Sequence, residues 1–289
     1  MARSLQFTPL VSSVIRHDLM CVDPRVAERF YGELFGWETL EIRVKGFAMK
    51  RLALGERVLG AILPFDPGHG VSSHWIPYIQ VADVDASCER VTELGGDVCV
   101  APADIPPGRF AVVNDPTEAL FSPFVPRSLP AWAADAAPVG AFAWDELRTD
   151  DPDAARAFYT ELLGWTANEL GGTTILSSDE LPVASIVAMP ERTTHAPMWI
   201  PYIKVDDPER IAIRATKLGA HLRLSPTEDP TLGTIAILRD PTGAYFGVGD
   251  GLSVQQLQPA TPRARSTRDG VLIPRSTRAA PRHANARRR

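Results

Sequence analysis

Hydrophobic positions follow a helical spacing in the segment DPRVAERFYGELFGW, residues 23–37, where apolar residues recur three and four positions apart. Asp23 followed by Pro24 is typical of a helix start, and Gly36 is typical of a helix end. β-rich segments flank this helix and cover residues 11–20 before it and 38–43, 47–53 and 58–63 after it. The pattern predicts a unit of one strand, one helix and three strands.

The chain contains an internal repeat, so this unit is expected four times. Three pairs of segments align in the same order, at offsets of 128, 124 and 125: DPRVAERFYGELFGW with DPDAARAFYTELLGW (23–37, 151–165), HWIPYIQVADVD with MWIPYIKVDDPE (74–85, 198–209), and NDPTEALF with RDPTGAYF (114–121, 239–246). Similar blocks at drifting offsets indicate a duplicated domain with small loop deletions.

The repeat and the local composition predict the domain limits. An N-terminal domain is expected over residues 8–127 and a C-terminal domain over 141–250, joined by the Ala- and Pro-rich linker 128–140. Residues 251–289 hold nine Arg, four Pro and a single acidic residue, Asp269. Such a segment cannot bury enough apolar surface to fold, so we expect a disordered tail.

Charge is distributed unevenly. The chain has 30 Lys and Arg and 35 Asp and Glu, and the tail takes nine Arg and one Asp, which leaves residues 1–250 with a net charge of −13. An acidic body repels phosphate, so we expect no nucleic acid on the folded part. The Arg-rich tail leaves open a weak interaction with nucleic acid or with another acidic partner.

The remaining bulk properties predict a cytoplasmic protein. No apolar run approaches the roughly 18 residues that a membrane span needs, and the N-terminus lacks a signal-peptide pattern. Three cysteines without CxxC spacing are typical of reduced, buried thiols. We expect a monomer or a homodimer with a small-molecule ligand and no membrane partner.

The motifs FYGELFGW, FYTELLGW and DPTGAYF, set in paired strand–helix–three-strand units, resemble the vicinal oxygen chelate superfamily, the glyoxalase, bleomycin resistance protein and dioxygenase group. The resemblance covers about residues 10–250 and is greatest to tandem two-domain glyoxalase-like proteins. It implies an α+β fold in which the four units form curved mixed sheets around open cavities.

The resemblance also locates a metal site for testing. Enzymes of this superfamily hold a divalent cation through His, Gln or Glu on facing strands, where it acts as a Lewis acid. The matching positions in the two copies hold Arg16 and Trp144, Ile76 and Ile200, and Ser122 and Gly247. None of these residues is a usual ligand for such a cation. We therefore expect no metal and no other cofactor. The alternative is a divalent-metal lyase or dioxygenase of glyoxalase or extradiol type whose ligands lie one position away.

Strand alternation predicts which side chains line each cavity, because residues i and i+2 share a face. The expected lining residues are Arg16, Asp18, Tyr78 and Gln80 in the first copy and Trp144, Glu146, Tyr202 and Lys204 in the second. Asp18 and Glu146 are the candidate catalytic residues, and the other six are candidate ligand-binding residues. The competing interpretation pairs each carboxylate with Arg16 or Arg148.

Two histidines leave a further metal possibility open. His17, His74 and Asp18 together contain the ligand types of a known metal set. The alternation assigns both imidazoles to the side away from the cavity, so we expect structural roles for His17 and His74.

The two copies differ in ways that favour the second as the functional one. Trp144 and Tyr202 suit a flat or apolar ligand, and Glu146 and Lys204 would place an acid and a base across one cleft. We expect a glyoxalase-like protein that binds a small organic molecule without metal. A cofactor-independent hydroxylase-like or isomerase-like enzyme is the catalytic version of that hypothesis.

Overall fold

The computed structural model describes residues 13–44, 47–66, 68, 72–129, 136–190 and 195–251, all within one compact unit. The predicted tail falls outside the described residues except for Gly251, as does part of the predicted linker, residues 130–135. The predicted limits of domains, linker and tail therefore stay predictions. Below, domain 1 denotes Val14–Pro126 and domain 2 denotes Phe142–Gly249.

The order of elements is the predicted one, four times over. Domain 1 contains β1 (Val14–Cys21), α1 (Pro24–Phe35), β2 (Glu38–Val44), β3 (Phe47–Leu54), β4 (Arg57–Pro64), β5 (His74–Gln80), α2 (Val84–Glu93), β6 (Asp97–Ile105), β7 (Gly108–Asn114) and β8 (Leu120–Pro126). Domain 2 contains β9 (Phe142–Thr149), α3 (Pro152–Leu163), β10 (Thr166–Leu170), β11 (Thr173–Ser178), β12 (Leu181–Ala188), β13 (Met198–Lys204), α4 (Pro208–Lys217), β14 (His221–Asp229), β15 (Gly233–Arg239) and β16 (Tyr245–Gly249).

Local sequence explains where the first helix of each domain begins and ends. The Asp23 carboxylate accepts hydrogen bonds from the backbone N–H groups of Arg25 and Val26, and Pro24 follows it. These groups lack partners within the helix itself, so the cap stabilises the first turn. The helix ends at Gly36, whose φ of 74° lies in the left-handed region that favours glycine.

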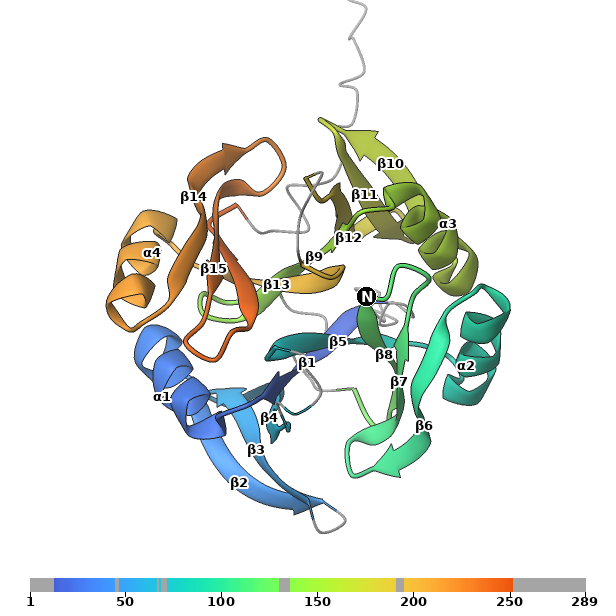
Figure 1. Ribbon diagram of the computed structural model, residues 1–289, viewed down its shortest axis with the longest axis horizontal. Helices are drawn as coiled ribbons and strands as arrows, with labels where there is room; N and C mark the ends of the chain where they lie inside the picture. Colours follow the sequence, from blue (N-terminus) through green and yellow to red (C-terminus); the bar gives the residue numbers. More distant parts are fainter. Residues whose placement is uncertain are drawn as a thin grey trace, which may run out of the picture. The chain divides into compact units, whose positions relative to one another are not determined.

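Each domain folds into one eight-stranded mixed sheet, which confirms the expected α+β class. The strand order is β2-β3-β4-β1-β5-β8-β7-β6 in domain 1 and β10-β11-β12-β9-β13-β16-β15-β14 in domain 2. The first strands of the two units, β1 and β5 or β9 and β13, lie antiparallel at the centre (Figure 1). Each sheet curls, with helices on its convex side and a concave face opposite.

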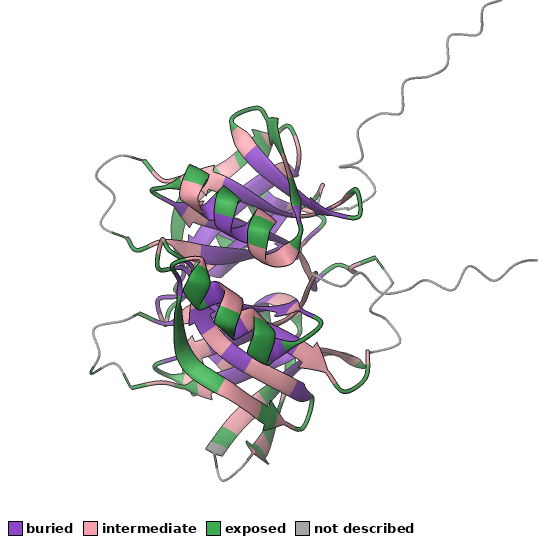
Figure 2. Cartoon of the chain, turned by 90° about the vertical axis from the view of Figure 1, so that its right-hand side faces the viewer, coloured by how far each residue is buried: buried purple, intermediate pink, exposed green. Residues whose placement is uncertain are grey.

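The convex faces form the two main cores, and each core combines both domains. One contains Tyr31 of α1 and Phe246 of β16, and the other contains Tyr159 of α3 and Phe121 of β8. Buried positions accordingly concentrate on the strands and on the inner sides of the helices (Figure 2). The domains are thus one packed body and share their hydrophobic cores.

The repeated motif residues connect the domains. The Tyr31 hydroxyl donates to Asp240 at 2.9 Å and accepts from Trp75 Nε1 at 3.3 Å. In the mirror contact Tyr159 donates to Asp115 at 2.9 Å and accepts from Trp199 at 3.0 Å. All of these groups are buried. The tyrosine of each FY motif, the aspartate of each DP motif and the tryptophan before IPY therefore build the interface.

His17 and Asp145 occupy equivalent positions of the repeat and meet each other. His17 Nε2 and Asp145 Oδ1 lie 2.7 Å apart, and both side chains are buried. His17 therefore faces domain 2 and lies away from the concave face, as the alternation predicts.

No helix in the described part of the chain is long and apolar enough to cross a membrane.

Candidate functional site

Strand register brings the predicted lining residues together on the concave faces. Arg16 lies opposite Tyr78 and Asp18 opposite Ile76, while Ser122 follows Tyr78 on the other side. Directly paired residues of neighbouring strands share a face. Domain 2 repeats the arrangement with Trp144 opposite Tyr202, Glu146 opposite Ile200, and Gly247 beside Tyr202. Each row thus joins three strands at the centre of a sheet.

Both candidate catalytic carboxylates pair with an arginine on their own strand. Asp18 Oδ1 accepts from Arg16 Nε at 2.9 Å and lies 2.8 Å from Arg16 Nη2 and from the Ala61 backbone N–H. Glu146 Oε1 accepts from Arg148 Nε at 2.6 Å. The competing interpretation of paired carboxylates therefore describes both copies. The partner of Glu146 is Arg148, as the competing interpretation has it, and not Lys204.

The arginine lies on opposite sides of the acid in the two copies. In domain 1 the concave residues of β1 read Arg16, Asp18 and Met20, and in domain 2 those of β9 read Trp144, Glu146 and Arg148. Both strands therefore carry an acid–arginine ion pair, but the third concave residue is Met20 on β1 and Trp144 on β9. This difference changes which side chain covers the centre of each sheet.

Burial changes the acid–base properties of the domain 2 face. Burial raises the pKa of Glu146, and Arg148 partly offsets this by favouring the charged carboxylate. Burial and the nearby Glu146 carboxylate hold the pKa of Tyr202 well above its ordinary value. The Tyr202 hydroxyl is buried and has no hydrogen-bond partner among the described residues. Burial likewise raises the pKa of Tyr78 in domain 1.

The residues at the metal position of domain 2 do not fit a divalent cation. A Cβ added at Gly247 would lie 2.6 Å from Tyr202 Cγ and closer still to two other ring atoms, so the phenol ring covers the strand there. The Trp144 indole donates to Ser185 Oγ at 3.0 Å. Aromatic rings therefore lie where a ligand carboxylate and an imidazole would be needed.

Domain 1 offers no better ligand set. The Ser122 hydroxyl donates to the Ala111 carbonyl at 2.6 Å, and the neighbouring positions hold Arg16 and Ile76. Within the ranges that the structure describes, no three His, Cys, Asp or Glu side chains gather as metal ligands. The residues present thus do not match the donors that a hard or borderline cation requires.

The expectation for His74 needs one correction. His74 lies opposite Met20 and two residues before Ile76, so it belongs to the concave face, and its assignment to the other side is wrong. Its Nδ1 lies 2.8 Å from the Ser72 carbonyl oxygen, and its ring packs edge-on against Phe65. His17 contacts Asp145 instead, so the two imidazoles do not come together.

The concave face of domain 2 is closed by packing. Its β14–β15 hairpin has three residues between the strands, against two between β6 and β7, and the third is Leu232. Leu232 is 3% exposed and joins Trp144, Tyr202, Ile235 and Ile237 in one apolar cluster. Trp144 and Tyr202 are 3% and 0% exposed. These aromatic side chains form a small second core.

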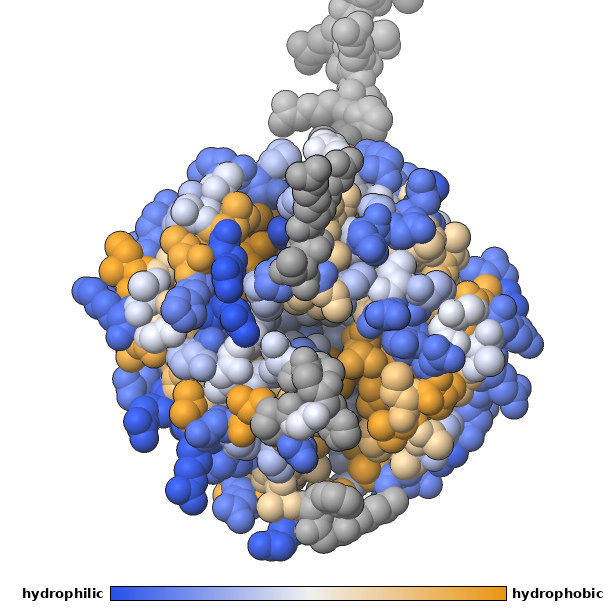
Figure 3. Space-filling model, in the orientation of Figure 1, coloured by the Kyte–Doolittle hydropathy of each residue, from blue (hydrophilic) through white to orange (hydrophobic). Residues whose placement is uncertain are grey.

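The concave face of domain 1 is more accessible. Its apolar cluster has only Ile76, Tyr78 and Phe124 as buried members, with Phe110 and Val112 half-buried beside them. The equivalent positions in domain 2, Ile235 and Ile237, are buried. Hydrophobic residues also gather on the surface over β6–β8 of this domain (Figure 3).

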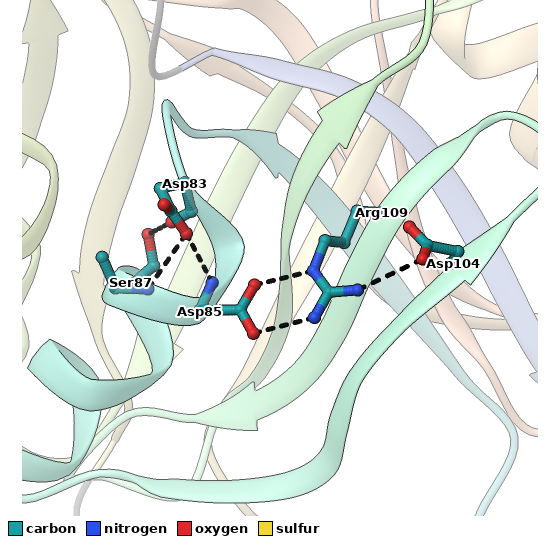
Figure 4. A network of polar contacts seen from close by, with 6 residues as sticks. Asp83, Asp85, Ser87, Asp104 and Arg109 are labelled. Atoms are coloured by element: carbon teal, nitrogen blue, oxygen red, sulfur yellow. Dashed lines mark hydrogen bonds and ion pairs between the residues drawn. The ribbon is translucent and has the colours of Figure 1, made fainter.

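An ion pair fixes the β6–β7 hairpin that carries Phe110. Arg109 donates through Nε and Nη2 to the two oxygens of Asp85 at 2.7 and 2.8 Å, and through Nη1 to Asp104 at 3.4 Å (Figure 4). This pairing lowers the pKa of Asp85. Asp85 belongs to the first turn of α2, whose cap is Asp83. The hairpin is therefore attached to the helix on the convex side, while Phe110 faces the concave side.

Comparison with known proteins agrees with this fold. A family model described as a glyoxalase-like domain matches residues 142–249, and the model of the glyoxalase/bleomycin resistance protein/dioxygenase superfamily matches residues 14–122. The chain is 32% identical over 244 residues to the putative glyoxylase CFP32 of Mycobacterium tuberculosis, covering 80% of this chain and 92% of that protein. It is 30% identical over 266 residues to the anthracycline biosynthesis protein DauV of a Streptomyces species, covering 86% and 94%.

Solved structures share the fold at low sequence identity. The Mn(II)-bound glyoxalase from Novosphingobium aromaticivorans matches with a TM-score of 0.59 and 18% identity, over 84% of this chain and 83% of that one. The 2,2',3-trihydroxybiphenyl 1,2-dioxygenase from Sphingomonas wittichii matches with a TM-score of 0.60 and 13% identity, over 84% and 91%. With two tandem domain matches and full-length relatives, this chain belongs to the glyoxalase/bleomycin resistance protein/dioxygenase superfamily.

Proposed function

We propose that this protein binds a small, partly aromatic organic molecule on a concave sheet face, without a divalent metal. The observation that supports this most is the aromatic face of domain 1, where half-buried Phe110 lies next to the buried rings of Tyr78 and Phe124. The Tyr78 ring lies parallel to Phe110 at 6.2 Å and edge-on to Phe124 at 5.4 Å, beside the Arg16–Asp18 pair. A few polar groups on an apolar wall are typical of small-molecule sites.

The choice of domain 1 departs from the sequence-based preference for domain 2, which stays a prediction. A ligand that reached Trp144 and Tyr202 would have to displace Leu232 and its neighbours first. Half-buried Phe110 and Met20 leave part of the domain 1 face in contact with solvent. Asp18, Arg16, Tyr78 and Gln80 are therefore the site residues of the main proposal.

The names of two relatives, DauV and DnrV, place those proteins in anthracycline biosynthesis, and anthracyclines are aromatic compounds. This agrees with an aromatic ligand for the present chain. It leaves open whether the ligand is only bound or also converted by a cofactor-independent hydroxylase-like or isomerase-like reaction.

Domain 2 supports a second candidate site. A buried carboxyl group with a raised pKa beside a tyrosine hydroxyl that lacks a partner is a costly arrangement, and such arrangements concentrate at functional sites. In this candidate, Glu146 would exchange a proton with a ligand that Trp144, Tyr202 and Lys204 surround, after Leu232 moves aside.

Paired variants separate the two faces. Ligand-detected NMR with an aromatic fragment library on Asp18→Asn and Glu146→Gln would compare equivalent positions of the repeat. We expect Asp18→Asn alone to lose or weaken binders. Loss in Glu146→Gln alone would instead place the site in domain 2, and an absence of binders for the unaltered protein would contradict the proposal as a whole.

Metal content tests the other half of the proposal. We expect the purified protein to contain no stoichiometric metal, because arginine, apolar side chains and a glycine replace the usual ligands. About one tightly bound Zn, Ni, Mn or Fe per domain by elemental analysis would favour the divalent-metal lyase or dioxygenase instead.

A further inference from the structure

One sheet row of domain 1 carries a second arginine on the concave face. Register aligns Arg51 of β3 with Ala61 of β4, and Ala61 with Asp18 of β1. Paired residues share a face, so Arg51 lies on the same side as Asp18 and its partner Arg16. Arg51 and Asp18 are two strands apart, which is about 10 Å between backbones. Only the methyl side chain of Ala61 lies between them.

Arg51 has no partner of its own in the ranges that the structure describes. It is exposed, and no ion pair or hydrogen bond involves its side chain. The nearest acid on its face by register is the exposed Glu38, diagonal to it on β2, and the two form no ion pair. The Arg51 guanidinium therefore keeps its donors free for another group.

Arg16 contributes a second guanidinium. Its Nε and Nη2 both contact a single oxygen of Asp18, and its Cζ lies 5.5 Å from the centre of the Tyr78 ring. The Arg16 side chain is 15% exposed. Its Nη1 has no partner among the described residues. Arg16 and Asp18 cancel in charge, so Arg51 leaves this row with a net positive charge on a body whose residues 1–250 carry −13.

The equivalent row in domain 2 contains neither of the two arginines. Ile175 occupies the position of Arg51, and Ser185 that of Ala61. Trp144 replaces Arg16, and its indole hydrogen-bonds to Ser185 across the row. The arginines are therefore not a property of the repeated framework, and they coincide with the face that packing leaves accessible.

We propose that the domain 1 face recognises an aromatic molecule that carries an anionic oxygen, such as a carboxylate or a phenolate, and that Arg51 binds this oxygen together with Arg16. This rests on the proposed function, whose ligand it specifies. Guanidinium groups bind carboxylates through charge-assisted hydrogen bonds. Half-buried Phe110, which packs on the buried Tyr78 ring, provides the contact for the ring system.

The test compares two probes that differ in charge. The full-length protein is titrated with 2-naphthoate and with the neutral 2-naphthamide, and dissociation constants are measured by NMR. We expect naphthoate to bind the unaltered protein more tightly than naphthamide. Arg51→Gln should weaken naphthoate about tenfold and leave naphthamide unchanged. Added salt should weaken naphthoate binding less in Arg51→Gln than in the unaltered protein.

Arg43→Gln is the matched control, since it removes the same charge from an exposed residue of β2 on the opposite face. It should leave both probes unaffected. Equal binding of the two probes, or equal losses in the two arginine variants, would overturn the anion inference while aromatic binding stands. Binding of neither probe would count against the proposed function and this inference together.

Discussion

The two concave faces share one strand framework but are covered by different side chains. At equivalent positions domain 1 has Arg16 and Arg51, and domain 2 has Trp144 and Ile175. Tyr202 lies over Gly247, whereas Tyr78 lies beside Ser122, whose side chain already occupies that strand. A face filled by its own aromatic side chains stabilises the fold and excludes other molecules, so one strand framework supports either a packed or a more exposed face.

The convex sides differ from the concave faces, because their interface contacts use the same residue types in both copies. There the two copies share the tyrosine and aspartate that join one copy to the other. The residues that make the repeat visible in the sequence are therefore interface residues. His17 and Asp145 are the exception, because they differ between the copies and contact each other across the interface.

The largest expected difference between the faces comes from Trp144→Ala. Removing a buried tryptophan leaves a cavity and an unpaired Ser185, so the free energy of unfolding should fall by about 3–5 kcal/mol. The equivalent variant Arg16→Ala should cost less than Trp144→Ala, because Arg16 is partly solvated. Urea unfolding of both variants tests this, and equal losses would show that the domain 2 face is no core.

The next effect concerns the strand beneath Tyr202. Gly247→Ala places a methyl group against the phenol ring, which should cost roughly 1–3 kcal/mol through overpacking. Ser122→Ala at the equivalent position adds no volume and loses one hydrogen bond, so about 1 kcal/mol is expected. A stable Gly247→Ala with unchanged Tyr202 resonances would mean that the ring has room to move.

The interface contacts should respond alike in both copies. Tyr31→Phe and Tyr159→Phe each remove a hydroxyl that donates to a buried aspartate and accepts from a tryptophan, at a cost of about 1–3 kcal/mol. Thermal and urea unfolding should give similar losses for the two variants. A large inequality would show that the domains do not share their interface symmetrically.

The sequence predicted most of the fold because the fold depends on local signals. Asp23 and Gly36 delimit α1 where expected, and the repeat provides a second, equivalent segment for each predicted helix and strand. Alternation placed Asp18, Glu146, Tyr78 and Tyr202 on their faces correctly. It failed for His74, which shares the concave face with Ile76 two residues further on.

Contacts between distant segments could not be read from the sequence. That Leu232 closes domain 2 depends on one additional residue in a hairpin, which looks like any loop difference. Arg51 was missed because it becomes relevant only when β3, β4 and β1 are in register. For Glu146 the sequence left Arg148 and Lys204 both open, and the positions of the side chains within one face were needed to choose Arg148.

The smallest expected effect is the pH dependence that Glu146 confers on stability. Its folded-state pKa is raised, so folding favours the protonated carboxyl. The corresponding stability is fully present below the unfolded-state pKa and is lost as pH rises through the folded-state pKa. Glu146→Gln cannot ionise, so it lacks this loss. Relative to the unaltered protein, Glu146→Gln should therefore become more stable, with a larger free energy of unfolding, as the pH increases from about 4.

Urea titrations at successive pH values measure this difference directly. Asp115 and Asp240 also have pKa values raised by burial, but they are present in both proteins and cancel in the comparison. Arg148→Gln provides the second arm, because Arg148 favours the ionised carboxylate. Its removal should raise the pKa of Glu146 further and steepen the loss of stability with pH. If Glu146→Gln and the unaltered protein keep a constant difference at every pH, then water reaches Glu146 and the domain 2 face is as open as that of domain 1.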